Sequence, residues 1–128
     1  LLPRDPDASA RRLQAPLADV AGGRVGVVVC DTHGRAFRRG LVNVAIGVAG
    51  FEAVEDHRGT RDREGRVLVA TEQAIADELA AASGLLMPKG GGTPAVLFSG
   101  VSTTPSPGGA AALIRDPEHD LFRGSTAD

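Results

Sequence analysis

Side chains that could do chemistry follow directly after the most apolar run of the chain. Residues 25–30, Val-Gly-Val-Val-Val-Cys, are rich in β-branched residues, and Asp31 and Thr32 come next. A carboxylate and a hydroxyl are hard oxygen ligands of the kind that bind a divalent cation, while guanidinium groups neutralise phosphate oxygens. The pattern therefore indicates a metal-bound phosphate at Asp31 and Thr32, with Arg35 and Arg38 among the neighbouring cations.

The same residues also have a purely structural interpretation. Aspartate and threonine at the end of a strand are common turn and capping residues, and neighbouring arginines usually lie in a solvated loop. Under either interpretation, the apolar pattern predicts a buried strand over residues 24–30 with the polar cluster at its carboxyl end, where α/β sites usually lie. A second apolar strand is expected over residues 43–49.

A second group with anion-binding chemistry is the segment Lys89-Gly90-Gly91-Gly92. Successive glycines can turn backbone N–H groups towards a phosphate, and the lysine adds a positive charge. The segment is not a Walker A loop, because its lysine precedes the glycines and a helix precedes the lysine. A flexible turn before a strand over residues 95–99 is the alternative interpretation.

The remaining pattern predicts the elements that must position these residues. A helix is expected over residues 7–20, with Asp7 as its N-cap and Pro16 as a kink or early end. A second helix is expected over residues 70–86 because its apolar residues recur at helical spacing. The polar stretch 50–66 is either a solvated surface loop or, given its length, a functional one. We therefore predict an α+β fold, with a mixed β-sheet and helices packed on it.

Composition excludes several classes of protein. The 128 residues fit one domain, and the net charge of −2 gives no basic surface for nucleic acid. No apolar run approaches the roughly 18 residues of a membrane span, so a cytoplasmic location is expected. The single cysteine, Cys30, precludes an internal disulfide and is interpreted as a small buried hydrophobe. The three histidines are too scattered for a zinc site.

Four blocks of sequence resemble a known family. In chain order they are LLPRDPDASARRL, VGVVVCDTHGRAFRRGLVNVAIGVAG, DHRGTRDREGRVL and AIADELAAASGLLMPKGGGTPAVLFSG. Together they resemble the coenzyme F-420-0:L-glutamate ligase family, the γ-glutamyl ligases of deazaflavin coenzyme biosynthesis. The resemblance runs over residues 1–122, leaving 123–128 as a C-terminal tail. It implies a partial ligase domain, corresponding to the C-terminal half to two-thirds of the family's domain.

The resemblance implies a GTP-dependent amide ligase that is a homodimer. The deazaflavin precursor's carboxylate is activated as an acyl phosphate, and the amine of L-glutamate displaces the phosphate. The implied ions are Mg²⁺ or Mn²⁺, with K⁺ as a further candidate, and the implied partners are GTP, L-glutamate and the deazaflavin precursor. This chain alone is expected to be inactive. The alternative is a non-catalytic binding or structural module that retains the scaffold.

Individual roles follow from the resemblance by position. Asp31 and Thr32 correspond to the family's metal ligands, and the segment after the second helix corresponds to the part that approaches nucleotide. This second group is Met87, Lys89, Gly90 and Gly91. Arg35, Arg38, Asp56 and Arg58 correspond to substrate or phosphate contacts. The sequence departs from the family's pattern near the expected site, at His33, Leu41, Val42, Pro88 and Ser99.

Overall fold

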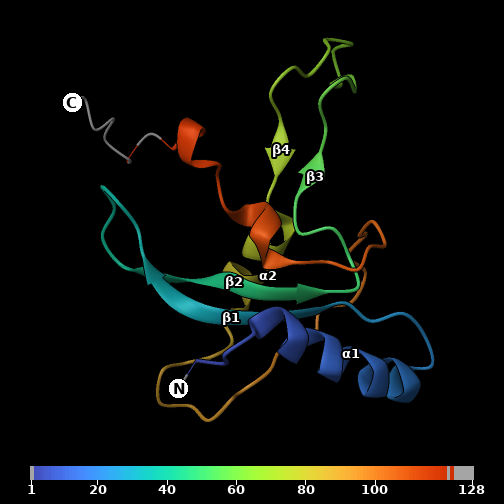
Figure 1. The fold of residues 1–128 in the computed structure, drawn as a ribbon, viewed down its shortest axis with the longest axis vertical. Coiled ribbons are helices and arrows are strands. Elements are labelled where there is room, and N and C mark those ends of the chain that lie inside the picture. Colours follow the sequence, from blue (N-terminus) through green and yellow to red (C-terminus); the bar gives the residue numbers. More distant parts are fainter. Residues whose placement is uncertain (1, 121, 123–128) are drawn as a thin grey trace.

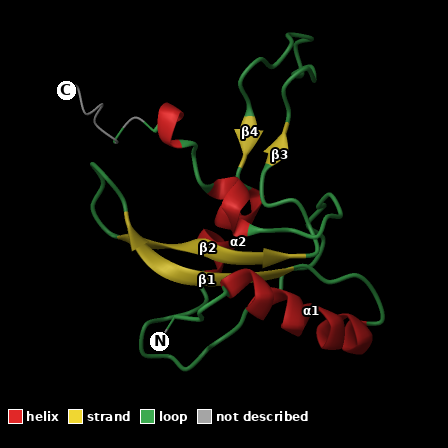
Figure 2. Ribbon diagram, viewed as in Figure 1, coloured by secondary structure: helices red, strands yellow, loops and turns green. Residues whose placement is uncertain are grey.

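The computed structural model describes residues 2–120 and 122, and it confirms the α+β class. The helices are α1 (Pro6–Ala21) and α2 (Ile75–Ser83), and two short 3-10 helices follow, η1 (Ala110–Leu113) and η2 (Pro117–His119). The strands are β1 (Val27–Gly34), β2 (Leu41–Ala49), β3 (Glu55–Asp56) and β4 (Glu72–Gln73) (Figure 2).

The hairpin β1–β2 is the middle of three layers, with α1 on one face and α2 with η1 on the other (Figure 1). Side chains alternate between the two faces of a strand, so each face builds its own core. Ala10 of α1 packs with Val27 and Ala49 on one face. On the other face, Val48 packs with Ile75 of α2 and with neighbouring residues of the same cluster. The second cluster comprises Val48, Phe51, Ala53, Ile75 and Ala76.

Helix α1 starts and ends with clear capping interactions. The side chain of Asp5 accepts a hydrogen bond from the backbone N–H of Ala8 at 2.8 Å, so Asp5 is the N-cap and the predicted cap at Asp7 is wrong. Gly22, with φ of 66°, ends the helix in the left-handed conformation that glycine adopts most readily. Pro16 lies inside the helix and does not end it. Ala10 is the buried residue of this helix, while its larger apolar side chains Leu13, Leu17 and Val20 are exposed.

Strand β1 is longer than the sequence predicts. It pairs antiparallel with β2 from Val27 opposite Ala49 to Gly34 opposite Leu41. A bulge leaves Ile46 without a partner, where the register shifts. Asp31 and Thr32 are therefore strand residues, opposite Val44 and Asn43, and not part of a turn. Their polarity is compatible with a strand because this end of the hairpin is more exposed.

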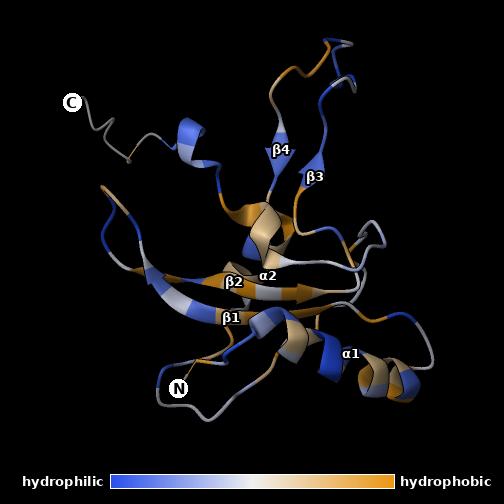
Figure 3. Ribbon diagram, viewed as in Figure 1, coloured by the Kyte–Doolittle hydropathy of each residue, from blue (hydrophilic) through white to orange (hydrophobic). Residues whose placement is uncertain are grey.

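Residues 55–73 form an arm that extends away from the three layers, and both of its strands are hydrophilic (Figures 1 and 3). The arm pairs β3 with β4 in antiparallel register, Glu55 with Gln73 and Asp56 with Glu72. Helix α2 therefore begins only at Ile75, five residues later than predicted. Hydrogen bonds within the arm, such as that between Gly59 N–H and Leu68 O at 2.8 Å, extend it beyond the two short strands.

The predicted mixed sheet is wrong in two respects. All strand pairs among residues 2–120 and 122 are antiparallel, and they form two separate two-stranded sheets. Residues 95–99 form no strand. The expected C-terminal tail, 123–128, lies outside the described residues. Within the described chain, no helix is both long and apolar enough to cross a bilayer.

Candidate functional site

The strand motif and the glycine-rich segment meet, although they are far apart in sequence. The ammonium Nζ of Lys89 donates a hydrogen bond to the hydroxyl Oγ1 of Thr32, 57 residues away. Thr32 is half-buried on β1, and Lys89 is exposed. Two residues that the sequence interprets as metal and phosphate contacts therefore share one location. A single sequence contains no signal for this contact.

Glycines shape the turn that carries Lys89. The backbone N–H of Gly91 donates to the carbonyl of Pro88 at 2.9 Å and closes the turn. A Cβ on Gly91 would overlap the ring of Pro88, so only glycine fits there. Because the Gly91 N–H is used within the turn, Lys89 and the amides of Gly90 and Gly92 are the donors of this segment left for an anion. Met87 is half-buried just before the turn.

A small polar cluster fixes the end of α2 against the hairpin beneath Lys89. The side-chain amide of Asn43 donates to the hydroxyl of Ser83 at 3.4 Å, and that hydroxyl donates to the Ala80 carbonyl at 2.7 Å. The sulfur of Cys30 lies 3.9 Å from the same hydroxyl. Gly84 permits this approach, because a Cβ there would lie 3.3 Å from the Asn43 amide nitrogen. The cluster sets where the chain leaves α2, and so where Lys89 falls.

Asp31 and Thr32 lie on opposite faces of β1. Thr32 shares a face with Cys30, which contacts Ser83 of α2. Asp31 shares the other face with Val29, which packs against the core beside α1. The Asp31 side chain is exposed, and no group of three metal-binding side chains exists among the described residues. A Mg²⁺ ion needs six oxygen ligands and often takes only one or two carboxylates from protein. Asp31 therefore fits as one ligand of an ion that water or phosphate also holds.

Arg35 and Arg38 lie in the hairpin loop, just beyond Gly34. Their side chains form no ion pair with any other described residue, so both guanidiniums can bind an anion. Arg35 donates weakly to the carbonyl of Arg39 at 3.4 Å. Phe37, between them, has a φ of 59°, a left-handed conformation that is uncommon for a bulky residue.

Asp56 and Arg58 lie on the arm and bind each other. The guanidinium of Arg58 donates from Nε and Nη2 to the two oxygens of Asp56, at 2.8 and 2.6 Å. It also lies 3.3 Å from Glu72. The Arg58 hydrogen bonds lower the pKa of Asp56 from 3.8 to about 2, and the same contact raises the pKa of Arg58. The structure thus places this pair in an ion-pair network among residues of the arm itself.

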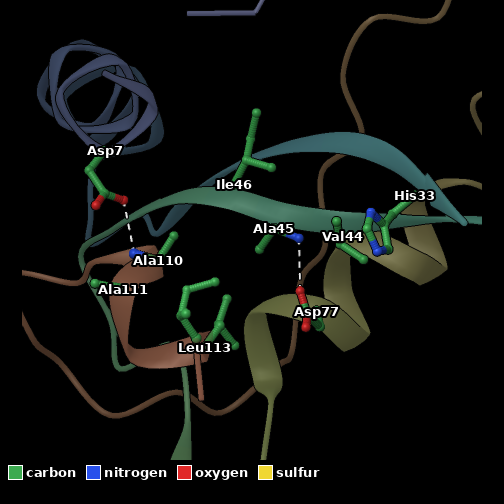
Figure 4. A pocket seen from close by; sticks show the side chains of 10 residues that line it. Asp7, His33, Val44, Ala45, Ile46, Asp77, Ala110, Ala111 and Leu113 are labelled. Atoms are coloured by element: carbon green, nitrogen blue, oxygen red, sulfur yellow. Dashed lines mark hydrogen bonds between the residues drawn. The ribbon is translucent and has the colours of Figure 1, made fainter. Parts of the chain in front are cut away.

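A separate cleft of about 590 Å³ follows the outer edge of β2 (Figure 4). The carboxylate of Asp77 accepts the backbone N–H of Ala45 at 2.8 Å. Asp7 accepts the N–H of Val48 at 2.8 Å and that of Ala110 at 3.0 Å. His33 lies at the other end of the cleft. The sequence gives no indication of these contacts, since it predicts Asp7 only as the N-cap of the first helix.

Comparison with known proteins adds independent findings. The sequence model of the F420-0:Gamma-glutamyl ligase family matches residues 1–100. Curated proteins named coenzyme F420:L-glutamate ligase from Methanothermobacter thermautotrophicus and Methanopyrus kandleri are each 46% identical to this chain. The relative from Archaeoglobus fulgidus, with the same name, is 44% identical. Each match covers 96% of this chain but only 50%, 51% and 49% of the respective relatives. The chain spans about half the length of the curated relatives it matches.

Proposed function

Because the chain belongs to the F420-0:gamma-glutamyl ligase family, we propose that it forms part of an active site that joins L-glutamate to a deazaflavin coenzyme precursor by a γ-linked amide bond. The relatives are named coenzyme F420:L-glutamate ligases, which supports the amide-forming reaction. The contact between Lys89 and Thr32 supports the location, because it joins the two segments that carry the motif residues.

The proposed reaction uses GTP to activate a carboxylate. An oxygen of the precursor's carboxylate attacks the γ-phosphorus, GDP leaves, and an acyl phosphate forms. The amine of L-glutamate then attacks the acyl carbon, loses a proton and expels inorganic phosphate. Phosphoryl transfer of this kind depends mainly on positioning and on neutralising charge. The cations Lys89, Arg35 and Arg38 are the groups of this chain that would hold phosphate oxygens.

Asp31 is the residue we propose for a divalent cation. Mg²⁺ or Mn²⁺, when bound, would neutralise charge on the nucleotide's phosphates. Because Thr32 lies on the other face of β1 and already contacts Lys89, we assign Thr32 to the phosphate side of the site. Gly90, Gly91 and Met87 would shape the approach of the nucleotide. K⁺ remains a further candidate ion without an assigned residue.

The described residues supply one wall of such a site. A single exposed carboxylate leaves most ligand positions of a metal to other groups. We therefore propose that the chain alone is inactive and acts with the polypeptide that corresponds to the other half of its relatives, in a cytoplasmic homodimer. The same observation favours the second candidate function, a binding or structural module without turnover.

The experiment is reconstitution. The chain is mixed with the half of the Methanothermobacter thermautotrophicus relative that it does not match, and GTP, L-glutamate, deazaflavin precursor and Mn²⁺ are added. We expect phosphate release and glutamylated product from the mixture only. Lys89→Met should lower turnover strongly, and Arg63→Gln, on the arm, should leave it unchanged. A mixture that folds and associates but gives no product would favour the non-catalytic module.

A further inference from the structure

Residues 92–103 form a segment outside the helices and strands whose backbone groups have no hydrogen-bond partners. No backbone or side-chain hydrogen bond involves any of these twelve residues within the described chain. The contrast with the next residues is sharp, since Thr104 O accepts from Glu52 N–H at 2.9 Å and Pro107 O accepts from Gly50 N–H at 3.5 Å. Backbone polar groups in folded proteins are almost always paired or solvated. The segment therefore has a full set of donors and acceptors to offer.

Its composition is that of a strand and not of a loop. Residues 95–98 read Ala-Val-Leu-Phe, a run that favours strands, and Pro94 at its start occupies a position where strands tolerate proline. Leu97 is 86% exposed and Val96 is half-buried, which is the alternation of a strand with one face on the protein. An exposed, unpaired and apolar segment that favours the strand conformation is a template for pairing with another strand.

The segment begins directly after the proposed phosphate site. Gly92 has a φ of 67° and follows the turn that carries Lys89, so a strand paired with residues 95–99 would lie beside that turn. This chain offers the proposed metal one exposed carboxylate, Asp31, so most of the ion's ligand positions stay open to other groups. A second polypeptide placed here would be positioned to add the missing ligands.

We propose that residues 95–99 are a docking strand that pairs with a β-strand of the polypeptide corresponding to the half of the relatives' length outside the match. The proposal rests on the proposed function, and it names the element through which the divided site is assembled. The occupant follows from the coverage of the relatives, about half of their length, and from the position of the strand beside Lys89. Main-chain hydrogen bonds would supply affinity, and the alternate side chains would supply specificity.

Hydrogen–deuterium exchange tests the strand directly. The chain is measured alone and with the unmatched half of the Methanothermobacter thermautotrophicus relative, and exchange is followed at the amides of residues 95–99. We expect exchange there to slow by at least about tenfold in the mixture, as for other hydrogen-bonded strands. Leu97→Pro, which removes one donor, should abolish this protection and weaken association. Leu97→Thr keeps the donor and the strand preference, so it should retain most of the protection.

Each outcome decides the matter. Protection in the mixture that Leu97→Pro removes and Leu97→Thr keeps supports the docking strand. Protection of the chain alone that rises with its concentration would identify a second copy as the occupant and overturn the proposal. Absence of association, or association without protection of residues 95–99, would also overturn it. Glutamylated product without protection would leave the proposed function standing while the docking strand fails. Circular dichroism of each variant confirms that it is folded.

Discussion

The carboxylate of Asp7 accepts a hydrogen bond from the backbone N–H of Ala110, 103 residues further along the chain, at 3.0 Å. The same oxygen accepts the N–H of Val48 at 2.8 Å. One side chain at the start of α1 therefore accepts hydrogen bonds from a backbone N–H on the outer edge of β2 and from the first backbone N–H of η1, as Figure 4 shows for Ala110. Because an unpaired N–H of an edge strand invites pairing with another chain, this carboxylate also protects the edge.

Asp7→Ala should destabilise the fold. The substitution leaves two backbone donors without their acceptor, one on the buried Val48 and one on the half-buried Ala110, and each such loss costs on the order of 1 kcal/mol or more. We expect the free energy of unfolding in urea to fall by about 1–3 kcal/mol. Asp19→Ala is the matched control, because Asp19 is an exposed carboxylate on the same helix. Equal stability of the two variants would show that the Asp7 contacts contribute nothing.

Gly47→Ala should destabilise the hairpin through a steric clash. Gly47 is buried in β2, and a Cβ there would overlap the backbone of Pro6 at the start of α1. Overpacking of this kind typically costs about 1–3 kcal/mol. Gly34→Ala is the control, because the atom nearest to a Cβ at that strand position is a Leu41 methyl at 3.8 Å. Thermal unfolding should separate the two variants, and a neutral Gly47→Ala would show that α1 can shift.

The Asp56–Arg58 ion pair should weaken only in strong acid. The pKa of Asp56 is lowered to about 2, chiefly by the side-chain hydrogen bonds from Arg58. A carboxyl group whose pKa is lower in the folded than in the unfolded chain contributes its full stabilisation at pH values above the unfolded-state pKa. This contribution is lost as the pH falls through the folded-state pKa. The pair should therefore be intact above roughly pH 4 and lost towards pH 2. The NMR signal of the Asp56 carboxyl carbon, followed as a function of pH, should give a titration midpoint of about 2.

Two substitutions on the arm test whether Arg58 lowers the pKa of Asp56. Arg58→Gln should raise the pKa of Asp56 part of the way towards 3.8, because it removes the side-chain hydrogen bonds from Arg58 while the backbone N–H of residue 58 still donates to Asp56. Arg63→Gln, elsewhere on the arm, should leave the pKa of Asp56 unchanged. A midpoint near 3.8 in the unsubstituted chain would contradict the ion-pair geometry.

Metal binding should depend on Asp31 and not on Thr32. With one carboxylate available, we expect weak Mn²⁺ binding by the chain, and Asp31→Ala should abolish it in calorimetry. Thr32→Val should leave the affinity unchanged, because the two side chains point to opposite faces of β1. Asp19→Ala serves as the control for nonspecific attraction by an exposed carboxylate. Unchanged affinity in Asp31→Ala would remove Asp31 from the site.

The sequence predicts those features that depend on local chemistry. The α+β class, helix α1 and the two apolar strands of the hairpin follow from local sequence patterns. The family is also identified correctly from its blocks of sequence. These features share one property, since each is encoded within a continuous stretch of chain.

The errors arise where distant residues decide the structure. Strand β1 was predicted to end at Cys30 because polar residues follow, yet pairing with β2 carries it to Gly34. The helical spacing of apolar residues places Glu72 within the predicted helix 70–86, although pairing with Asp56 puts it in a strand. Residues 95–99 have strand propensity but find no partner among the described residues. The contact between Lys89 and Thr32 is equally invisible to local patterns.

The three-layer arrangement also determines an order of events during synthesis. Helix α1 and the hairpin are complete once Ala49 has left the ribosome, so one face of the hairpin can be covered early. Helix α2 is complete only at Ser83, 34 residues later. At roughly 5–20 residues per second, translation leaves the second face, including Val48, uncovered for roughly 2–7 seconds. During that interval this apolar face is the surface of the nascent chain that chaperones would bind.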